Sequence, residues 1–296
     1  MEQIVYLNGS LLPQSQAKIS PFDLGFLYGY GLFETMRAYS GHIFRLERHL
    51  ERLSQSAKLL GLPLNAFDLK RACHDTLQAN KLKKARIRLT VSIGEGEAAP
   101  DLPKHPKPTV LVTATRYVPL ADEAYRKGYK AVVSTIDRDS QSPLSRLKSA
   151  NYLNNILARR EAGAAGADES ILLNERGFLC EGSASNIFLV SKGNLITPGE
   201  ESGCLPGITR QVVIELAHGL GIGHSEREVR LEELLHAGEA FLTNSIMELM
   251  PLVEVNGQRI GRGKVTGRLM QAYRETVVRE TKKGLKPLAK PREKSP

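Results

Sequence analysis

Hydrophobic periodicity stops at residues 116–124, where Pro119 stands in a stretch with neither helical nor strand alternation. Strand and helix signals occur on both sides of this stretch, and domains commonly contain about 150 residues. The 296 residues therefore suit two α+β domains. We expect a small N-terminal domain over 1–117, a linker over 118–122 and a larger C-terminal domain over 123–280.

The first half carries two strong local signals. Asn8-Gly9 between short apolar runs predicts a β-hairpin, because this dipeptide favours the tight turn that a hairpin needs. An apolar stripe over residues 45–60 predicts an amphipathic helix that ends at Gly61. The stripe consists of Leu46, Leu50, Leu53, Ala57 and Leu60. The other expected elements are irregular backbone over 21–31, a helix over 66–80 and strands over 85–93 and 109–115.

In the second half the strand signals cluster ahead of a helix that Gly207 is expected to open. The buried stripe of this helix is predicted to be Val213, Leu216, Ala217 and Leu220. Asn256-Gly257 predicts another hairpin. The remaining expected elements are strands over 130–135, 169–174, 178–180, 186–191, 194–197 and 240–243 and a helix over 151–162.

The net charge of +9 is concentrated near the C-terminal end. Residues 282–296 hold six basic side chains and one acidic one, which is +5 of the +9 and leaves +4 for the rest. We expect residues 281–296 to form a disordered basic tail. The remaining charge suits a small anionic substrate, and no helix-turn-helix, zinc-finger or stacked-aromatic pattern favours nucleic acid.

Cysteine and hydropathy patterns narrow the classes further. Three scattered cysteines fit neither a disulfide framework nor a four-cysteine metal site. No apolar run approaches the roughly 18 residues that span a bilayer, and the N-terminus is unlike a signal peptide. We therefore expect a cytoplasmic protein with no metal centre and no membrane contact.

Lys148 and Glu181 are candidates for cofactor chemistry. A partly buried lysine can form a Schiff base with an aldehyde cofactor, because desolvation lowers the pKa of the amine. Glu181 is expected between two apolar strands, where a carboxylate can keep a pyridinium nitrogen protonated. Taken alone, each residue also suits a plainer interpretation: Lys148 as a solvated lysine before a helix, and Glu181 as a charged turn residue.

Two further segments suit a phosphate. Gly207-Ile208-Thr209 at a helix start would expose free N–H groups and the positive end of the helix dipole. The alternative is that Thr209 is an ordinary N-cap. Thr243-Asn244-Ser245 follows a short strand and can donate to a second side of the same phosphate, or can simply form a turn.

Arginines provide two more candidates. Arg45, Arg48 and Arg52 share a helix flank, and such a run is usually solvated, although Arg52 beside Leu53 can lean inward toward a phosphate. Arg86 and Arg88 alternate in a strand and therefore share one face. They either protect a sheet edge or clamp a carboxylate.

Together, Lys148, Glu181-Gly-x-x-Ser-Asn, Leu205-Pro-Gly-Ile-Thr-Arg and Thr243-Asn-Ser resemble, in order and spacing, the class IV (fold-type IV) pyridoxal-phosphate enzymes. The resemblance implies a small α/β sandwich domain, a larger pseudo-barrel domain, a pyridoxal 5′-phosphate cofactor and a homodimer. It also implies that Lys148 bonds the cofactor and Glu181 pairs with its ring nitrogen. The other cofactor-binding positions implied are Arg52, Tyr152, Leu205, Gly207, Ile208, Thr209, Asn244 and Ser245.

Within the family, Phe33-Glu34-Thr35-Met36-Arg37 together with Thr243-Asn244-Ser245 is similar to the bacterial 4-amino-4-deoxychorismate lyases. This resemblance implies an anionic amino substrate, with catalytic Thr35 near the leaving group. Phe33, Tyr28, Arg86 and Arg88 would then be substrate-binding. The alternative is a transaminase for branched-chain L-amino acids or D-amino acids, and a further one is a non-catalytic binding protein that uses its basic surface.

Overall fold

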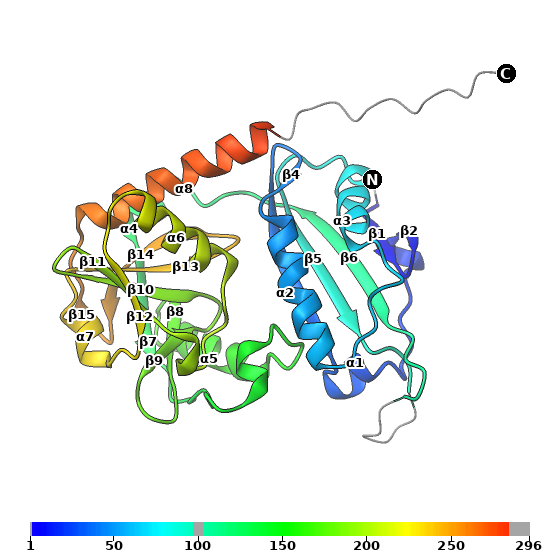
Figure 1. Cartoon of the computed structure of the whole chain (residues 1–296), viewed down its shortest axis with the longest axis horizontal. Helices are drawn as coiled ribbons and strands as arrows, with labels where there is room; N and C mark the ends of the chain where they lie inside the picture. The colour runs from blue at the N-terminus through cyan, green and yellow to red at the C-terminus, as the bar shows by residue number, and fades with distance from the viewer. Residues whose placement is uncertain (1, 97–102, 284–296) are drawn as a thin grey trace.

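The structure, a computed structural model, describes residues 2–96 and 103–283. Two separate β-sheets, each with its own helices, lie next to one another, and the long helix α8 (Lys264–Lys283) runs along one side (Figure 1). The α+β, two-lobed architecture expected from the sequence is confirmed. The first sheet ends with β6 at Arg116, and α4 (Asp122–Lys127) opens the second lobe. The expected linker at 118–122 lies between these elements, and the division into domains stays a prediction.

The first sheet is antiparallel, with strand order β2-β1-β6-β5-β3-β4. One face packs on helices α2 and α3, and its core includes Ile87, Leu89 and Val91 from the central strand β5. The alternate residues of β5 therefore face the second sheet. The strands are β1 (Ile4–Leu7), β2 (Ser10–Pro13), β3 (Gly31–Tyr39), β4 (His42–Ile43), β5 (Ala85–Ser92) and β6 (Thr109–Arg116), and the helices are α1 (Leu24–Tyr28), α2 (Leu46–Leu59) and α3 (Leu69–Ala79).

The second sheet is mixed, with strand order β12-β11-β10-β13-β14-β7-β8-β9 and β15 beside β14. Its apolar residues form cores on both faces, one of which packs on α6 and α8. The strands are β7 (Tyr129–Val133), β8 (Glu169–Leu173), β9 (Leu179–Gly182), β10 (Asn186–Ser191), β11 (Asn194–Pro198), β12 (His224–Arg227), β13 (Glu239–Asn244), β14 (Glu248–Val255) and β15 (Gln258–Arg259), and the helices are α5 (Leu153–Ala164), α6 (Ile208–Gly219) and α7 (Leu231–Leu235).

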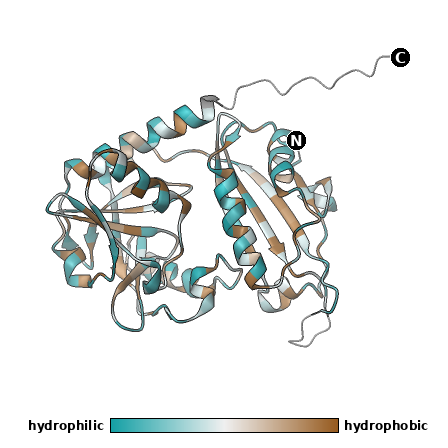
Figure 2. Ribbon diagram, viewed as in Figure 1, coloured by the Kyte–Doolittle hydropathy of each residue, from teal (hydrophilic) through white to brown (hydrophobic). Residues whose placement is uncertain are grey.

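Hydropathy along the chain follows these layers. Apolar residues concentrate on the strands of both sheets, and α2 turns a hydrophilic face outward (Figure 2). Both Asn-Gly hairpins are confirmed, with positive φ at Asn8, Gly9, Asn256 and Gly257. In the described part of the chain, no helix combines the length and apolarity needed to cross a bilayer.

Several local expectations were wrong. The segment over 21–31 contains a short helix, α1, which Asp23 caps by accepting from Gly25 N. Leu220 is exposed, and Val212 is buried in its place. Strand β3 and helix α8 were not predicted. Residues 281–283 belong to α8 rather than to a tail, and the rest of the expected tail lies outside the described residues.

Candidate functional site

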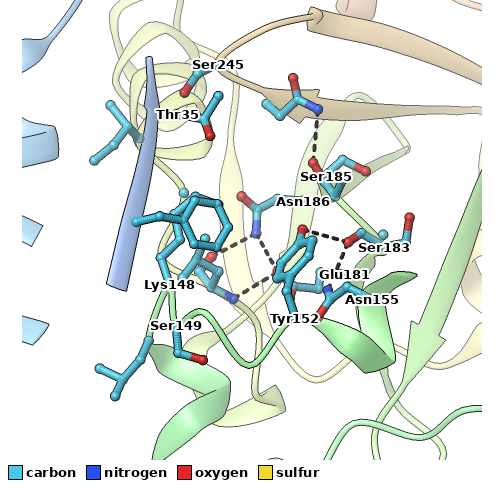
Figure 3. A pocket seen from close by; sticks show the side chains of 18 of the residues that line it. Thr35, Lys148, Ser149, Tyr152, Asn155, Glu181, Ser183, Ser185, Asn186 and Ser245 are labelled. Carbon is cyan, nitrogen blue, oxygen red and sulfur yellow. Dashed lines mark hydrogen bonds between the residues drawn. The ribbon is translucent and has the colours of Figure 1, made fainter. Parts of the chain in front are cut away.

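A cavity of about 490 Å³ lies between the two sheets. Strands β3 and β5 supply one wall, and the segment before α5, the end of β9, the start of α6 and the end of β13 supply the others. Lys148, Tyr152, Glu181 and Asn186 surround this space (Figure 3). The four motifs that lie far apart in the sequence therefore meet at one place.

Lys148 is held by backbone pairing with β3. Phe33 N donates to Lys148 O at 2.9 Å, and Ala150 N donates to Gly31 O at 2.8 Å. The Lys148 ammonium lies 4.7 Å from the centre of the Phe33 ring. Burial, followed by the nearby Arg52 cation, lowers the pKa of Lys148 to about 8. The amine is therefore far more often neutral at physiological pH than an ordinary lysine.

Glu181 lies inside β9 rather than in a turn between strands, so the turn interpretation was wrong. Its carboxylate is buried and pairs with Arg138 at 3.2 Å. It also accepts from Leu205 N at 2.9 Å and from Asn186 Nδ2 at 3.5 Å. Burial opposes the charge on Arg138, but Glu181 raises the pKa of its guanidinium above the usual value. An ionised carboxylate at the cavity wall is thus fixed from three sides.

Tyr152 closes the cavity beside Phe33, and the two rings meet edge to face with centroids 5.4 Å apart. Its hydroxyl donates to Ser183 O at 3.0 Å, and Asn155 Nδ2 donates to the same carbonyl at 2.9 Å. Burial raises the pKa of Tyr152 to about 12. The phenol therefore stays protonated and serves as a hydrogen-bond donor.

The start of α6 has the features of an anion site. Gly207 is the N-cap and no side chain caps the helix, so the interpretation of Thr209 as N-cap was wrong. The first N–H groups of α6 are consequently left to a ligand. Thr243 Oγ1, which also lines the cavity, is buried and has no hydrogen-bond partner. A Cβ at Gly207 would lie 1.9 Å from Asn186 Oδ1, so only glycine fits this cradle.

Arg52 reaches the same end of the cavity from α2. Its Nε and Nη2 donate to the two oxygens of Glu34 at 2.8 and 2.6 Å, and its Nη1 donates to Pro206 O at 2.8 Å. His49 Nδ1 lies 2.6 Å from Glu34 Oε2. Burial alone would raise the pKa of Glu34, but Arg52 and His49 lower it to about 2. Arg45 and Arg48 remain on the flank, where both pair with Glu215.

Arg86 and Arg88 both line the cavity, as does Thr35 from the adjacent strand. Strand β5 lies between β6 and β3, so the two arginines do not protect a sheet edge. The Arg88 guanidinium lies 3.9 Å from the centre of the Phe33 ring, and burial followed by Arg86 lowers its pKa. Tyr28 lies on α1, is exposed, and is not among the residues that line the cavity.

The segment after β13 forms a tight turn that lines the cavity. Asn244 Oδ1 accepts from Ile246 N and Met247 N at 2.9 and 2.8 Å, and its Nδ2 donates to Ala184 O at 3.0 Å. The Asn244 side chain therefore builds the turn, as one of the two interpretations of this segment proposed. Ser245 and Ile246 also line the cavity.

Sequence reasoning missed four groups around the cavity. Asn186 stands in the Glu181 motif but received no role, and Arg138 had no sequence signal because it follows no element boundary or repeat. The other two are the unpaired hydroxyl of Thr243 and the pair Glu34 and His49 behind Arg52. Among the described residues, no cluster of metal-ligating side chains is present.

The amino-transferase class IV family model matches residues 31–255. A Methanocaldococcus jannaschii protein, provisionally assigned as a branched-chain-amino-acid aminotransferase, is 39% identical over 95% of this chain and 98% of its own. The Bacillus subtilis aminodeoxychorismate lyase is 35% identical over 93% and 94%. The solved Escherichia coli branched-chain amino acid aminotransferase has a TM-score of 0.90, 32% identity, and coverage of 95% and 96%.

A further solved structure, the T.th. branched-chain amino acid aminotransferase, contains pyridoxamine 5′-phosphate and has a TM-score of 0.89 at 32% identity, with 96% of this chain and 97% of that chain covered. The cavity fits a group of this chemistry. Uncapped helix N–H groups and the unpaired Thr243 hydroxyl suit its phosphate. The fixed carboxylate of Glu181 suits a protonated ring nitrogen, and Lys148 has the lowered pKa that an aldehyde requires.

Proposed function

The chain belongs to the amino-transferase class IV family and uses pyridoxal 5′-phosphate, and on this basis we propose that it is a 4-amino-4-deoxychorismate lyase. Such an enzyme forms 4-aminobenzoate and pyruvate from aminodeoxychorismate. The observation that carries the proposal is the cavity wall formed by β3 and β5, which offers two guanidinium groups and a hydroxyl. The substrate has two carboxylates, which guanidinium groups bind well. A branched aliphatic side chain would leave Arg86 and Arg88 without partners.

We assign the cofactor contacts as follows. Lys148 bonds the cofactor covalently, Glu181 faces its ring nitrogen and Tyr152 faces its ring hydroxyl. Leu205 packs on the ring, and its N–H already holds Glu181. The phosphate lies at the start of α6 near Arg52. The phosphate contacts are assigned to Gly207, Ile208, Thr209, Arg52, Asn244 and Ser245.

When bound, the cofactor withdraws electrons from the carbon that carries the substrate amine. Lys148, once released from the cofactor, is the general base that takes the proton from this carbon. The neighbouring carbon–oxygen bond breaks, enolpyruvate leaves, and the ring becomes aromatic. Lys148 then returns the proton to the enolpyruvate to give pyruvate. Phe33 shields the amine, Thr35 lies at the leaving-group side, and Arg86 and Arg88 hold the carboxylates.

Transamination of branched-chain L-amino acids is the second candidate, because several of the relatives are named as enzymes of this class. It needs the same Lys148 as base, and it differs in where the proton is returned. Arg86 and Arg88 would then serve a dicarboxylic amino donor rather than the branched substrate. D-amino-acid transamination remains within this candidate.

The test is 4-aminobenzoate formation from enzymatically generated aminodeoxychorismate, with Lys148→Ala as the control. We expect product from the yellow wild-type protein and none from the variant. Absence of product from a folded, cofactor-loaded protein would overturn the lyase assignment. Pyridoxamine phosphate formed on adding branched-chain L-amino acids, or D-amino acids, would then favour the second candidate.

We also propose that the protein is a homodimer. Phe26 is 77% exposed on α1, and Leu153 and Ile156 are 65% and 51% exposed on α5. The two helices adjoin, since Asn151 Nδ2 donates to Gly29 O at 3.1 Å. Large apolar side chains gathered in this way usually mark an interface.

A further inference from the structure

The turn over residues 244–247 ends at a strained, buried residue. Glu248 has φ of 64° and its side chain is buried, although a left-handed backbone is uncommon outside glycine and asparagine. Such strain persists only where surrounding contacts impose it. The turn lines the cavity through Asn244, Ser245 and Ile246, so whatever imposes the strain also sets the shape of the cavity wall.

Arg37 supplies the main contact from outside the turn. Its Nη1 donates to Ile246 O at 2.8 Å and lies 3.0 Å from Glu248 Oε1. The guanidinium is buried between two rings, 4.4 Å from the centre of Tyr39 and 4.5 Å from that of Tyr117. One cation of the first sheet therefore grips both ends of a turn that belongs to the second sheet.

Aromatic hydroxyls hold the remaining acceptors of this turn. Tyr117 donates to Ile246 O at 3.0 Å, Tyr125 donates to Met247 O at 3.0 Å, and Tyr39 donates to Glu248 Oε1 at 2.9 Å. Tyr117 and Tyr125 come from the segment that joins the two sheets. The turn is thus fixed by residues that move with the connection between the lobes.

Arg37 does not itself line the cavity, although it shares a face of β3 with two residues that do. Phe33 and Thr35 lie four and two residues earlier along the strand, and both line the cavity. Strand alternation carries the same face onward to Arg37, which reaches the turn behind the wall. Its action on the reaction must therefore pass through the turn.

We infer that Arg37, paired with Glu248, is a positioning residue that sets the 244–247 turn and thereby determines how well the amino substrate is bound. The inference rests on the proposed function in one respect, that this cavity binds the substrate. It does not depend on whether the enzyme is a lyase or a transaminase. The predicted signature of a lost Arg37 is a looser turn and a weaker substrate affinity with little change in cofactor affinity.

Hydrogen–deuterium exchange of the cofactor-loaded protein tests the turn without using activity. In Arg37→Gln, we expect the Ile246 and Met247 amides to exchange at least about tenfold faster, because a hydrogen bond to a charged donor has been lost. Arg71→Gln removes an arginine from an exposed ion pair on α3 and should leave these amides unchanged. Unchanged exchange in Arg37→Gln would overturn the inference, even if no substrate has been found.

Kinetics then separate positioning from general damage. With whichever amino substrate turns over, Arg37→Gln should raise KM about tenfold and change kcat and cofactor affinity less than about threefold. Arg37→Lys keeps the charge and one donor, so it should restore most of the lost affinity. Glu248→Gln is the second variant, should Arg37→Gln fail to fold, and should shift KM and exchange in the same direction. A loss confined to kcat, or equal in cofactor affinity, would overturn the positioning role.

Discussion

At the scale of single residues, the free amine of Lys148 governs how the cofactor enters. Burial lowers the pKa of Lys148 to about 8, and only the neutral amine can attack an aldehyde. The rate of cofactor binding to the apoprotein should therefore rise about tenfold per pH unit below pH 8 and level off above it. Absorbance mixing experiments across pH measure this. A profile that still rises steeply at pH 10 would contradict the lowered pKa.

Glu34 is expected to matter for the phosphate and for acid stability. Glu34→Gln leaves buried Arg52 and His49 without their anion, which should cost about 3 kcal/mol of unfolding free energy. Pyridoxal phosphate should lose affinity in this variant, whereas pyridoxal, which lacks the phosphate, should not. Glu47→Gln, in an exposed pair on the same helix, is the matched control. Equal losses for both ligands would argue against Arg52 as a phosphate contact.

The pH dependence of stability carries the same information. The pKa of Glu34 is about 2 in the folded chain, against an ordinary value of 4.5. A lowered folded pKa stabilises the protein above pH 4.5, and this contribution is lost as the pH falls toward 2. Denaturation of the wild type over this range should be steeper than that of Glu34→Gln.

The sequence predicted residues better where spacing alone carries the information. Period two placed Arg86 and Arg88 on one face, and the structure turns both toward the cavity. Partners such as Arg138 for Glu181, or Glu34 for Arg52, could not be predicted, because they depend on how loops and helices from distant positions pack.

At the scale of elements, the start of α6 depends on the missing side chain of Gly207. A Cβ there would collide with Asn186 Oδ1, and Asn186 also donates to Leu205 O at 2.8 Å. Gly207→Ala should lower pyridoxal phosphate affinity at least about tenfold by displacing this cradle. Gly219→Ala, at the open end of the same helix, should not. Equal cofactor titrations for the two variants would refute the close fit.

Elements with a regular apolar stripe or an Asn-Gly turn were predicted correctly, including α2 and both hairpins. Strand β3 was missed because both of its faces are buried, one in the core and one against the second lobe. Glu34 and Arg37 on this strand are charged yet buried, so they hide its pattern. The strand with the densest set of functional side chains is consequently the one with the weakest sequence signal.

At the scale of the whole molecule, the exposed apolar residues of α1 and α5 predict self-association. Phe26→Glu should convert a dimer to a monomer or weaken it at least about a hundredfold, since it places a charge in the contact. Val278→Glu on α8, which lies on another side of the molecule in Figure 1, should not change the mass. Sedimentation equilibrium measures both. A monomeric wild type at micromolar concentration would contradict the homodimer.

The pairing of Lys148 with β3, and of Arg37 with the 244–247 turn, also orders events during synthesis. The reactive lysine can be docked once the first half and its own segment have left the ribosome, but the wall that closes the cavity arrives about a hundred residues later. A nascent chain can therefore hold the vitamin-derived group firmly only near the end of translation. The yellow colour of the bound group would then report that synthesis and assembly are complete, and stalled or prematurely terminated chains would remain colourless.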